Sequence, residues 1–336
     1  MIRAGLAALV MLAGQAVAAP EAPEAQTADA VPELALVTEA VVDGMPSGNL
    51  SGLARCGAEL WVVSDRDDGR LYRLEEGESG WSAIEESFLA PPPPAGGLPW
   101  GLRVRAWVSA QVRGGAMDFE GLACDALGNR YLVSEAHAAV LRLNPAGTAD
   151  WLALPASPVR QGRASGMLLG FNAGFEGIAV DPEAGRLWLA AERERRGLVV
   201  LHGNQSGWRC TGGCVLLAEG GTEATPPALG ARQQSRSFSG LAFHDGKLFT
   251  LERTSHRICR RDASNGVAER CWSYADAASA EGRRYDTPYG TAEALVIDAE
   301  GAWIGVDNNG KPRADGERRP VVWRFAAPKG GWSAVQ

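Results

Sequence analysis

Acidic side chains recur at matching positions along this sequence, and together they could bind a cation or transfer protons. Five stretches begin alike, at residues 51–65, 120–135, 176–192, 239–252 and 293–307. Each contains a short apolar run, a turn, and a second apolar run that ends at an acid. The opening positions are Ser51, Glu120, Glu176, Ser239 and Glu293, and the closing positions are Asp65, Glu135, Glu192, Glu252 and Asp307. Carboxylate oxygens are the ligands that Ca²⁺ prefers, and a free carboxylate can act as a general base.

The repeated unit predicts an all-β protein. Two apolar runs joined by a turn form an antiparallel hairpin, a third run usually follows, and several repeats add a fourth that begins at Trp81, Trp208, Cys271 or Trp332. Four-stranded units that recur about every 60 residues are typical of β-propeller blades. We therefore expect one propeller domain over residues 33–336, with five four-stranded blades. A sixth blade could form, because Glu33–Val42 and Trp100–Val112 also alternate like strands.

Hairpin geometry predicts that the acids gather at one end of the propeller. In an antiparallel pair, the first strand starts at the end where the second strand finishes. If the first strands line a central channel, up to eight carboxylates surround one mouth of it. Two proline-rich connections, at residues 90–99 and 220–236, are either lids over such an opening or tolerated insertions.

Crowded carboxylates repel one another and need compensation. Arg66, Arg193 and Arg253 each follow a closing acid directly and could pair with these acids. Alternatively, some carboxyl groups stay protonated, or Ca²⁺ binds among them. A structural alternative is that the glutamates accept hydrogen bonds from neighbouring blades and only fasten them together. The serines at two opening positions favour a functional site slightly, because an asymmetric ligand needs an asymmetric ring.

Familiar catalytic templates are missing from the sequence. It has no G-x-S-x-G and no H-E-x-x-H, and its four histidines lack metal-binding spacing. His137 is the one histidine placed near the predicted mouth, where it could act as an acid or base or simply lie in an exposed loop. A serine nucleophile at Ser51 or Ser239 would need a base, and only carboxylates are near. The run from Arg283 to Asp286 could contact an anion, although a charged turn looks the same.

Composition and the N-terminus indicate an exported protein. Residues 1–18 read as a signal peptide, and residues 19–32 as a disordered linker. No later segment is apolar and long enough to span a membrane. Six cysteines suit disulfides in an oxidising compartment, the periplasm or the exterior. Proximity pairs Cys210 with Cys214 and Cys259 with Cys271, which leaves Cys56 and Cys124 at equivalent places in two repeats. The net charge of −7 argues against nucleic acid as a partner.

Several motifs of these repeats resemble the exported phytase-like family, which is described as having esterase-like activity of phytase. They are "SGLA", "DFEGLA", "NAGFEGIAVDP", "AAER", "SFSGLAF" and "TAEALVID", and they extend from about Asn49 to Phe325. The resemblance implies a propeller outside the cytoplasm and a phosphoester or carboxylic ester hydrolase, assisted by calcium. Ala294 replaces the glycine that follows the other opening glutamates, and Ala136 follows Glu135 where an arginine would match the other repeats. The calcium-binding segments of secreted propeller phytases have no match here.

These observations lead to one main functional hypothesis. We expect a Ca²⁺-assisted ester hydrolase that acts on a small-molecule or phosphoester ligand at the channel mouth. Glu120, Glu176 and Glu293 are the predicted catalytic residues, and these three together with the five closing acids are the predicted metal ligands. The predicted substrate contacts are Arg66, Arg193, Arg253, Ser51, Ser239 and His137. A polyanion such as phytate would be repelled unless a cation inverted the local charge. The alternatives are a non-catalytic propeller that binds a ligand or an envelope protein, and a scaffold with structural carboxylates.

Overall fold

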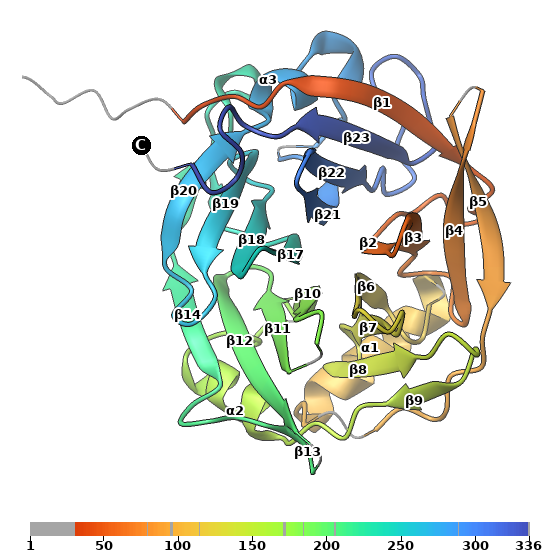
Figure 1. Ribbon diagram of the computed structural model, residues 1–336, viewed down its shortest axis with the longest axis vertical. Coiled ribbons are helices and arrows are strands. Elements are labelled where there is room, and N and C mark those ends of the chain that lie inside the picture. The colour runs from red at the N-terminus through yellow and green to blue at the C-terminus, as the bar shows by residue number, and fades with distance from the viewer. Residues whose placement is uncertain are drawn as a thin grey trace, which may run out of the picture. The chain divides into compact units, whose positions relative to one another are not determined.

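A computed structural model describes residues 31–334 except for residues 79, 95, 96, 114, 171, 172, 184, 205 and 288. The predicted signal peptide lies outside the described residues, as does the predicted linker up to residue 30. In the described part of the chain, antiparallel β-sheets stand around a common centre (Figure 1). The arrangement is a β-propeller, so the predicted all-β class is confirmed.

The first two sheets follow each other along the chain. One contains β2 (Gly52–Cys56), β3 (Glu59–Val63), β4 (Arg70–Gly77) and β5 (Gly80–Ser87). The next contains β6 (Phe119–Cys124), β7 (Arg130–Ser134), β8 (Ala139–Leu143) and β9 (Ala149–Trp151). In both sheets the strands pair antiparallel in sequence order, from the centre outward.

The remaining sheets repeat this order. The third contains β10 (Phe175–Val180), β11 (Arg186–Ala191) and β12 (Arg195–Asn204), which pairs with both β13 (Gly207–Arg209) and β14 (Val215–Gly220). The fourth contains β17 (Gly240–His244), β18 (Lys247–Glu252), β19 (Arg257–Asp262) and β20 (Ala268–Ser273). The last contains β21 (Ala292–Asp298), β22 (Gly301–Val306) and β23 (Val321–Ala326).

Strand β1 (Leu36–Asp43) closes the ring of sheets. It pairs antiparallel with β23 and, at its end, parallel with β5. The first and last sheets are thereby joined into one eight-stranded sheet. The N-terminal part of the domain is therefore held against its C-terminal part by backbone hydrogen bonds.

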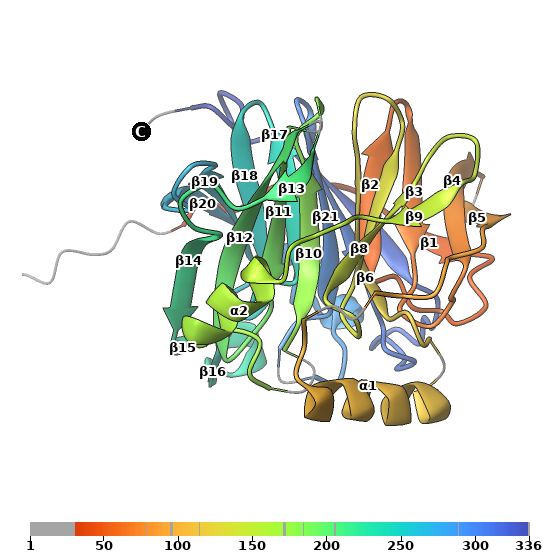
Figure 2. The same cartoon turned by 90° about the horizontal axis from the view of Figure 1, so that it is seen from below.

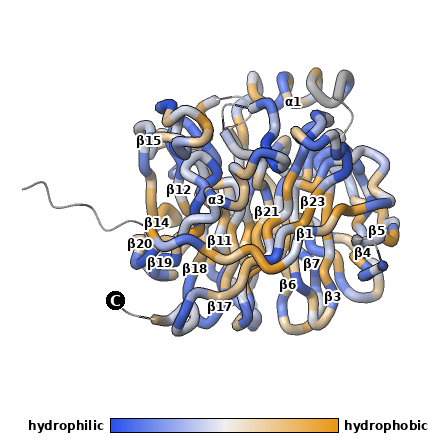
Figure 3. Tube along the Cα trace, turned by 90° about the horizontal axis from the view of Figure 1, so that it is seen from above, coloured by the Kyte–Doolittle hydropathy of each residue, from blue (hydrophilic) through white to orange (hydrophobic). Residues whose placement is uncertain are grey.

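The innermost strands β2, β6, β10, β17 and β21 surround a central channel. Residues from all five line one cavity of about 100 Å³, on the side of the channel away from the strand starts. Apolar side chains fill the spaces between neighbouring sheets, as Trp188, Leu198, Phe238 and Leu248 do between the third and the fourth. Figure 3 shows the apolar stretches concentrated in the strands. Burial of these sheet faces is the main favourable contribution to folding.

The two segments considered for a sixth blade do not form one. Residues 100–112 belong to helix α1 (Trp100–Arg113), where Leu102 and Ala106 are half-buried one helical turn apart. Glu33–Val42 contributes β1 to the sheet of β23. The expected fourth strand at Trp332 is also wrong, because this indole packs edge-on against Trp272 and Phe249 in a turn. Strand β1 occupies that outer edge instead.

Both proline-rich connections lie at the end where the inner strands start. The first leads into α1, which crosses this end beyond the sheets (Figure 2). The second forms a hairpin of β15 (Thr222–Ala224) and β16 (Gln233–Ser235) around the 3-10 turn Pro227–Leu229. The other helical segments are α2 (Ser157–Ala164), α3 (Ala275–Ala278) and the 3-10 turn Glu281–Arg283. Among the described residues no helix is long and apolar enough to cross a membrane.

Three disulfides form as predicted. Cys259 and Cys271 face each other on β19 and β20, and Cys210 and Cys214 close a short turn. Cys56 and Cys124 join the far ends of β2 and β6. This last bond links two neighbouring sheets at the end opposite to the acids.

Candidate functional site

A β-bulge places each opening glutamate. Phe119 and Gly121 pair with consecutive residues of β7, so Glu120 is an extra residue in its strand. The same register shift occurs in β10 at Glu176 and in β21 at Glu293. A bulge leaves one residue outside the regular ladder and re-aims its side chain, a device that is common near active sites. Here it turns three glutamates toward the channel mouth.

The two opening serines lie at strand starts that have no bulge. Strand β2 pairs regularly with β3 from Gly52, and β17 pairs regularly with β18 from Gly240. Both serines are 1% exposed. The hydroxyl of Ser51 accepts a hydrogen bond from the backbone N–H of Asp65, and the hydroxyl of Ser239 donates one to the carbonyl of Ala292. These hydroxyls satisfy backbone groups, so the difference between Glu and Ser in the repeat follows the presence of a bulge.

Close packing of the inner strands requires the glycines that follow Glu120 and Glu176, whereas Ala294 follows the bulged Glu293. A Cβ on Gly121 would lie 2.6 Å from the carbonyl oxygen of Glu176, and one on Gly177 would lie 2.9 Å from Cβ of Leu241. Neighbouring first strands therefore approach within van der Waals contact at these positions. The glycine of "EG" at these two positions therefore allows neighbouring inner strands to pack closely.

At the end of the propeller where the inner strands start, carboxylates from several sheets form one electrostatic network, which we call the acidic mouth. Its members are Asp65, Asp118, Glu120, Glu135, Glu176, Glu192, Glu293 and Asp307. Seven of these residues belong to the predicted set, and Asp118 is additional. The guanidinium groups of Arg66, Arg193 and Arg253 lie among them. The acidic mouth thus contains eight carboxyl groups and three arginine guanidinium groups.

Arginines compensate one half of the acidic mouth. Glu192 is fully buried and forms ion pairs with both Arg193 and Arg253. Arg253 also pairs with Glu293, and Arg193 lies 3.7 Å from Glu176. Two arginines therefore bridge three acids from two sheets. This part of the mouth supports the predicted remedy of pairing with arginine.

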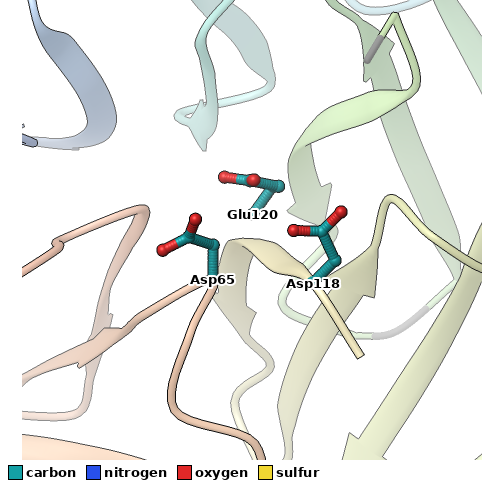
Figure 4. A group of neighbouring side chains, drawn as sticks. All are labelled: Asp65, Asp118 and Glu120. Carbon is teal, nitrogen blue, oxygen red and sulfur yellow. The ribbon is translucent and has the colours of Figure 1, made fainter. Parts of the chain in front are cut away.

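The other half contains a tight group of carboxylates. Oxygens of Asp65, Asp118 and Glu120 lie within 4.8 Å of one another (Figure 4). The guanidinium of Arg66 is 3.8 Å from Asp65, and it donates a hydrogen bond to Asn309 instead. Asn49 orients Asp65 by donating a hydrogen bond of 3.0 Å. Three converging oxygen ligands from two hairpins suit a hard cation such as Ca²⁺, whose other ligands would be water or carbonyl oxygens.

Burial and mutual repulsion raise the pKa values in this half. Burial, followed by the charges of Asp118 and Asp65, raises the pKa of Glu120 well above its usual range. Burial raises the pKa of Asp307 to about 7, and Asp65 adds to this effect. In the arginine-paired half, burial and the charge of Glu192 raise the pKa of Glu176 as well. In the absence of a cation, several of these groups hold protons at neutral pH, which was the second predicted remedy.

Glu135 lies between the acidic mouth and an apolar pocket. Its Oε1 accepts a hydrogen bond of 2.9 Å from the backbone N–H of Gly174. Burial and the neighbouring Asp118 nevertheless raise its pKa to about 8. A carboxyl group with a pKa near neutrality can both accept and donate a proton under physiological conditions.

The apolar pocket opens beside Asp118 and Glu135 and has a cavity volume of about 40 Å³. Its apolar walls are formed by Leu98, Leu102, Ala106, Ala136, Ala138 and Leu168. Leu102 and Ala106 come from α1, which closes the pocket from the outside. Among the described lining residues, the ionisable groups are Asp118 and Glu135, so the pocket has one acidic side and otherwise apolar walls.

Glu252 lies outside the acidic mouth. Its buried carboxylate accepts hydrogen bonds from Arg196, Arg257 and Arg261. Burial opposes ionisation, but the three guanidinium groups prevail and lower the pKa of Glu252 to about 2. Two of these arginines also stack on Phe238. This cluster resembles the structural alternative, because it fastens the third sheet to the fourth.

His137 lies beside α1 rather than among the mouth carboxylates. Its Nε2 is 3.2 Å from the carbonyl oxygen of Ala116. Burial lowers its pKa, and Arg103 contributes to that shift. Its ring lies edge-on to Trp151. Its predicted contact with substrate stays a prediction.

Asp118 is the functional candidate that sequence reasoning missed. It precedes Glu120 by two residues in "DFEG" but lies outside the aligned opening and closing positions. Its φ of +52° is unusual for a residue other than glycine. The hydroxyl of Ser134 and the carboxylate of Asp68 hold residues 116 and 117 just before it. A search for acids beside each strand start, as well as at the aligned positions, would have identified Asp118.

Comparison with known proteins assigns the family. The family described as "Phytase-like: Esterase-like activity of phytase" matches residues 45–257. The chain belongs to the phytase-like family. This confirms the resemblance seen in the sequence motifs. The matched region contains Asp65, Asp118 and Glu120, whereas Glu293 and Asp307 lie beyond it.

The chain is partly similar to several solved structures, at low sequence identity and with TM-scores below 0.5. Glutaminyl cyclase from Myxococcus xanthus is 9% identical, with 86% of this chain and 94% of that chain covered and a TM-score of 0.49. PQQ-bound aldose sugar dehydrogenase from Streptomyces coelicolor is 14% identical, with 88% and 100% covered and a TM-score of 0.43. Virginiamycin B lyase from Staphylococcus aureus is 10% identical, with 87% and 99% covered and a TM-score of 0.41. No curated protein matches the sequence.

Proposed function

We propose that this protein is an exported, cation-dependent hydrolase of carboxylic esters. One observation carries the proposal: the carboxylates of Asp65, Asp118 and Glu120 converge within 4.8 Å, and Asp118 also lines the apolar pocket. The proposed reaction site is thus adjacent to the apolar pocket, which can hold the apolar part of an ester. The phytase-like family is consistent with ester chemistry. The five repeats correspond to five blades in this proposal, and the three disulfides favour the periplasm or the exterior.

Asp65, Asp118 and Glu120 would hold the cation. Repulsion among them falls when a divalent cation binds, and the raised pKa of Glu120 falls with it. A cation bound there would polarise the ester carbonyl as a Lewis acid. The arginine-paired acids Glu192 and Glu293 are less suitable ligands, because Arg193 and Arg253 already occupy their oxygens.

Glu135 is the best-placed group for proton transfer. In its ionised form it takes a proton from the water that attacks the ester carbon. The bond between that carbon and the alkoxy oxygen breaks, and Glu135 returns the proton to the leaving alcohol. The products are a carboxylic acid and an alcohol, so the reaction consumes one water and needs no other reactant. Burial and Glu192 raise the pKa of Glu176 nearby, and this shift favours less negative charge around Glu135.

The charge of the site favours a neutral ester over a phosphate. One divalent cation compensates only part of the excess negative charge of the acidic mouth, and a phosphoester would add more. The pocket walls are apolar and offer no cation to a phosphate. A phosphoester is therefore the less favoured substrate class, and the experiment below distinguishes the two.

The test combines metal binding and turnover. Calcium binding is measured by calorimetry, and hydrolysis of p-nitrophenyl butyrate and p-nitrophenyl phosphate is followed with Ca²⁺ and with chelator. We expect butyrate hydrolysis that needs Ca²⁺ and falls at least about a hundredfold in Glu135→Gln, as loss of a general base does. Asp118→Asn should weaken calcium binding and turnover together. Glu183→Gln, in an exposed turn at the opposite end, is the matched control and should change neither.

Other outcomes have definite meanings. Calcium binding without turnover of either substrate would replace the enzyme by a cation-dependent binding module. Turnover of the phosphate alone would assign the site to phosphoesters. Turnover that is equal with chelator and with Ca²⁺ would overturn the cation dependence.

A further inference from the structure

Helix α1 has a second apolar face that is largely exposed, and part of it borders a groove with Pro93, Met117 and His137. Trp100, Val104, Trp107 and Val108 are 77%, 37%, 65% and 50% exposed. Their spacing of four, three and one residues places them on one side of an α-helix. Leu102 and Ala106, which line the apolar pocket, lie on the opposite side. The helix therefore contacts the domain with a narrow face and exposes a wider, tryptophan-rich face to solvent.

Arginines flank this exposed face. Arg103 and Arg105 are both exposed, and the sequence of α1 contains no acid. The whole chain, in contrast, carries a net charge of −7. The two exposed indoles of this helix do not favour solubility, because exposed apolar surface costs free energy in water. Tryptophan with flanking arginine is instead the composition of helices that lie in a lipid headgroup region.

The position of α1 suits a flat partner. Figure 2 shows the helix lying across the end of the domain, perpendicular to the strands and beyond them. Its exposed face thus forms part of an outer surface of the described domain. A planar surface could contact the full length of the helix without meeting the sheets first.

We propose that α1 docks this protein on a lipid surface that carries anionic headgroups. Trp100 and Trp107 would enter the interfacial region, and Arg103 and Arg105 would lie against the headgroup phosphates. The alkyl part of each arginine can extend along the membrane surface while its charge stays hydrated. The acidic remainder of the domain disfavours a broad contact with an anionic membrane, so binding is confined to this helix. This inference does not depend on the proposed hydrolase activity.

Vesicle binding of the full exported chain tests the proposal. Co-sedimentation is measured with vesicles of phosphatidylcholine alone and of phosphatidylcholine with phosphatidylglycerol. We expect binding only to the mixed vesicles, and weaker binding at high salt. The double variants Trp100→Ser/Trp107→Ser and Arg103→Glu/Arg105→Glu should each lower the partition coefficient at least about tenfold. The unfolding temperature of each variant is measured as a control, and a value equal to that of the parent would show that the variant is folded.

A matched control uses residues far from α1. Leu127 is 79% exposed in the turn between β6 and β7, at the opposite end, and Arg142 is exposed on β8. Leu127→Ser/Arg142→Glu should bind mixed vesicles like the parent. Equal binding by the parent and both helix variants would overturn the proposal, as would absence of binding. A dimer in sedimentation velocity that the tryptophan variant abolishes would assign the face to a second copy and also overturn it.

Discussion

Gly174 donates its backbone N–H to Oε1 of Glu135 over 2.9 Å, and this contact joins two neighbouring sheets at the acidic mouth. A Cβ on Gly174 would lie only 2.3 Å from Cγ of Glu135. The position of the carboxyl group therefore depends on the absence of a side chain at residue 174. The glycine in "NAGFEG" orients a residue from the preceding repeat.

Gly174→Ala is expected to displace Glu135 and to lower kcat about tenfold or more, because proton transfer requires close alignment. KM should change less than kcat, since the apolar pocket remains. Steady-state kinetics with p-nitrophenyl butyrate measures both. Gly185→Ala is the matched control, because a Cβ there has nothing within 4 Å. An unchanged kcat in Gly174→Ala would remove Glu135 from the proposed reaction.

Ala106→Trp is expected to change the substrate range. The new indole would fill the apolar pocket between α1 and Leu168. Hydrolysis of p-nitrophenyl butyrate should fall about tenfold more than hydrolysis of p-nitrophenyl acetate, because the longer chain loses its apolar contacts. A parallel loss for both esters would mean that the pocket does not hold the acyl chain.

The metal-free protein should become less stable as pH rises through neutrality. The folded state raises the pKa of Asp307 to about 7 and that of Glu135 to about 8. Proton binding to these groups stabilises the fold fully below their ordinary pKa near 4, and this stability is lost between about pH 4 and pH 8. Glu252 acts in the opposite direction, since its pKa is lowered to about 2 and its contribution is lost in acid.

Chemical denaturation at several pH values measures this dependence. The free energy of unfolding without metal should be greatest near pH 5 and lower at pH 8. Calcium should remove most of the loss at pH 8, because the cation replaces the protons. A metal-free protein that is more stable at pH 8 than at pH 5 would contradict the crowding of carboxylates.

Glu120→Gln and Glu252→Gln should have opposite effects on stability. Glutamine resembles the protonated form that the mouth favours at Glu120, so the free energy of unfolding should rise at pH 8 without metal and stay unchanged at pH 5. At Glu252 the substitution removes the counter-charge of buried Arg261 and one of the acidic partners of Arg196, which should cost about 3–5 kcal/mol. Urea denaturation of both variants measures the difference. Equal destabilisation would support purely structural carboxylates in the mouth.

The disulfide between Cys56 and Cys124 should contribute more to stability than the one between Cys210 and Cys214. Their sequence separations are 68 and 4 residues. Closing the longer loop restricts the unfolded chain more, so paired serine substitution should cost about 4 kcal/mol in the first case and about 2 kcal/mol in the second. Urea unfolding of Cys56→Ser/Cys124→Ser and Cys210→Ser/Cys214→Ser compares them. A larger loss for the short loop would contradict this entropic account.

Internal repetition made most of the fold predictable from the sequence. Apolar runs and turns recur in register, and each hairpin forms from residues close along the chain, so the all-β propeller and the two local disulfides could be anticipated. The same pattern identified seven of the eight residues of the acidic mouth. It failed at residues 100–112, where alternation typical of a strand coexists with helical spacing of Leu102 and Ala106. Packing over the apolar pocket selects the helix there.

Only the tertiary structure decided which acids share one environment. Glu192 and Glu252 occupy equivalent sequence positions, yet Glu192 belongs to the mouth while three arginines bind Glu252. Asp118 joins Asp65 and Glu120 because two neighbouring hairpins converge. Sequence spacing fixes which residues begin and end a strand, since hairpin geometry is local. The partner of a buried charge is set by side chains from other sheets, and their distances appear only when the ring closes.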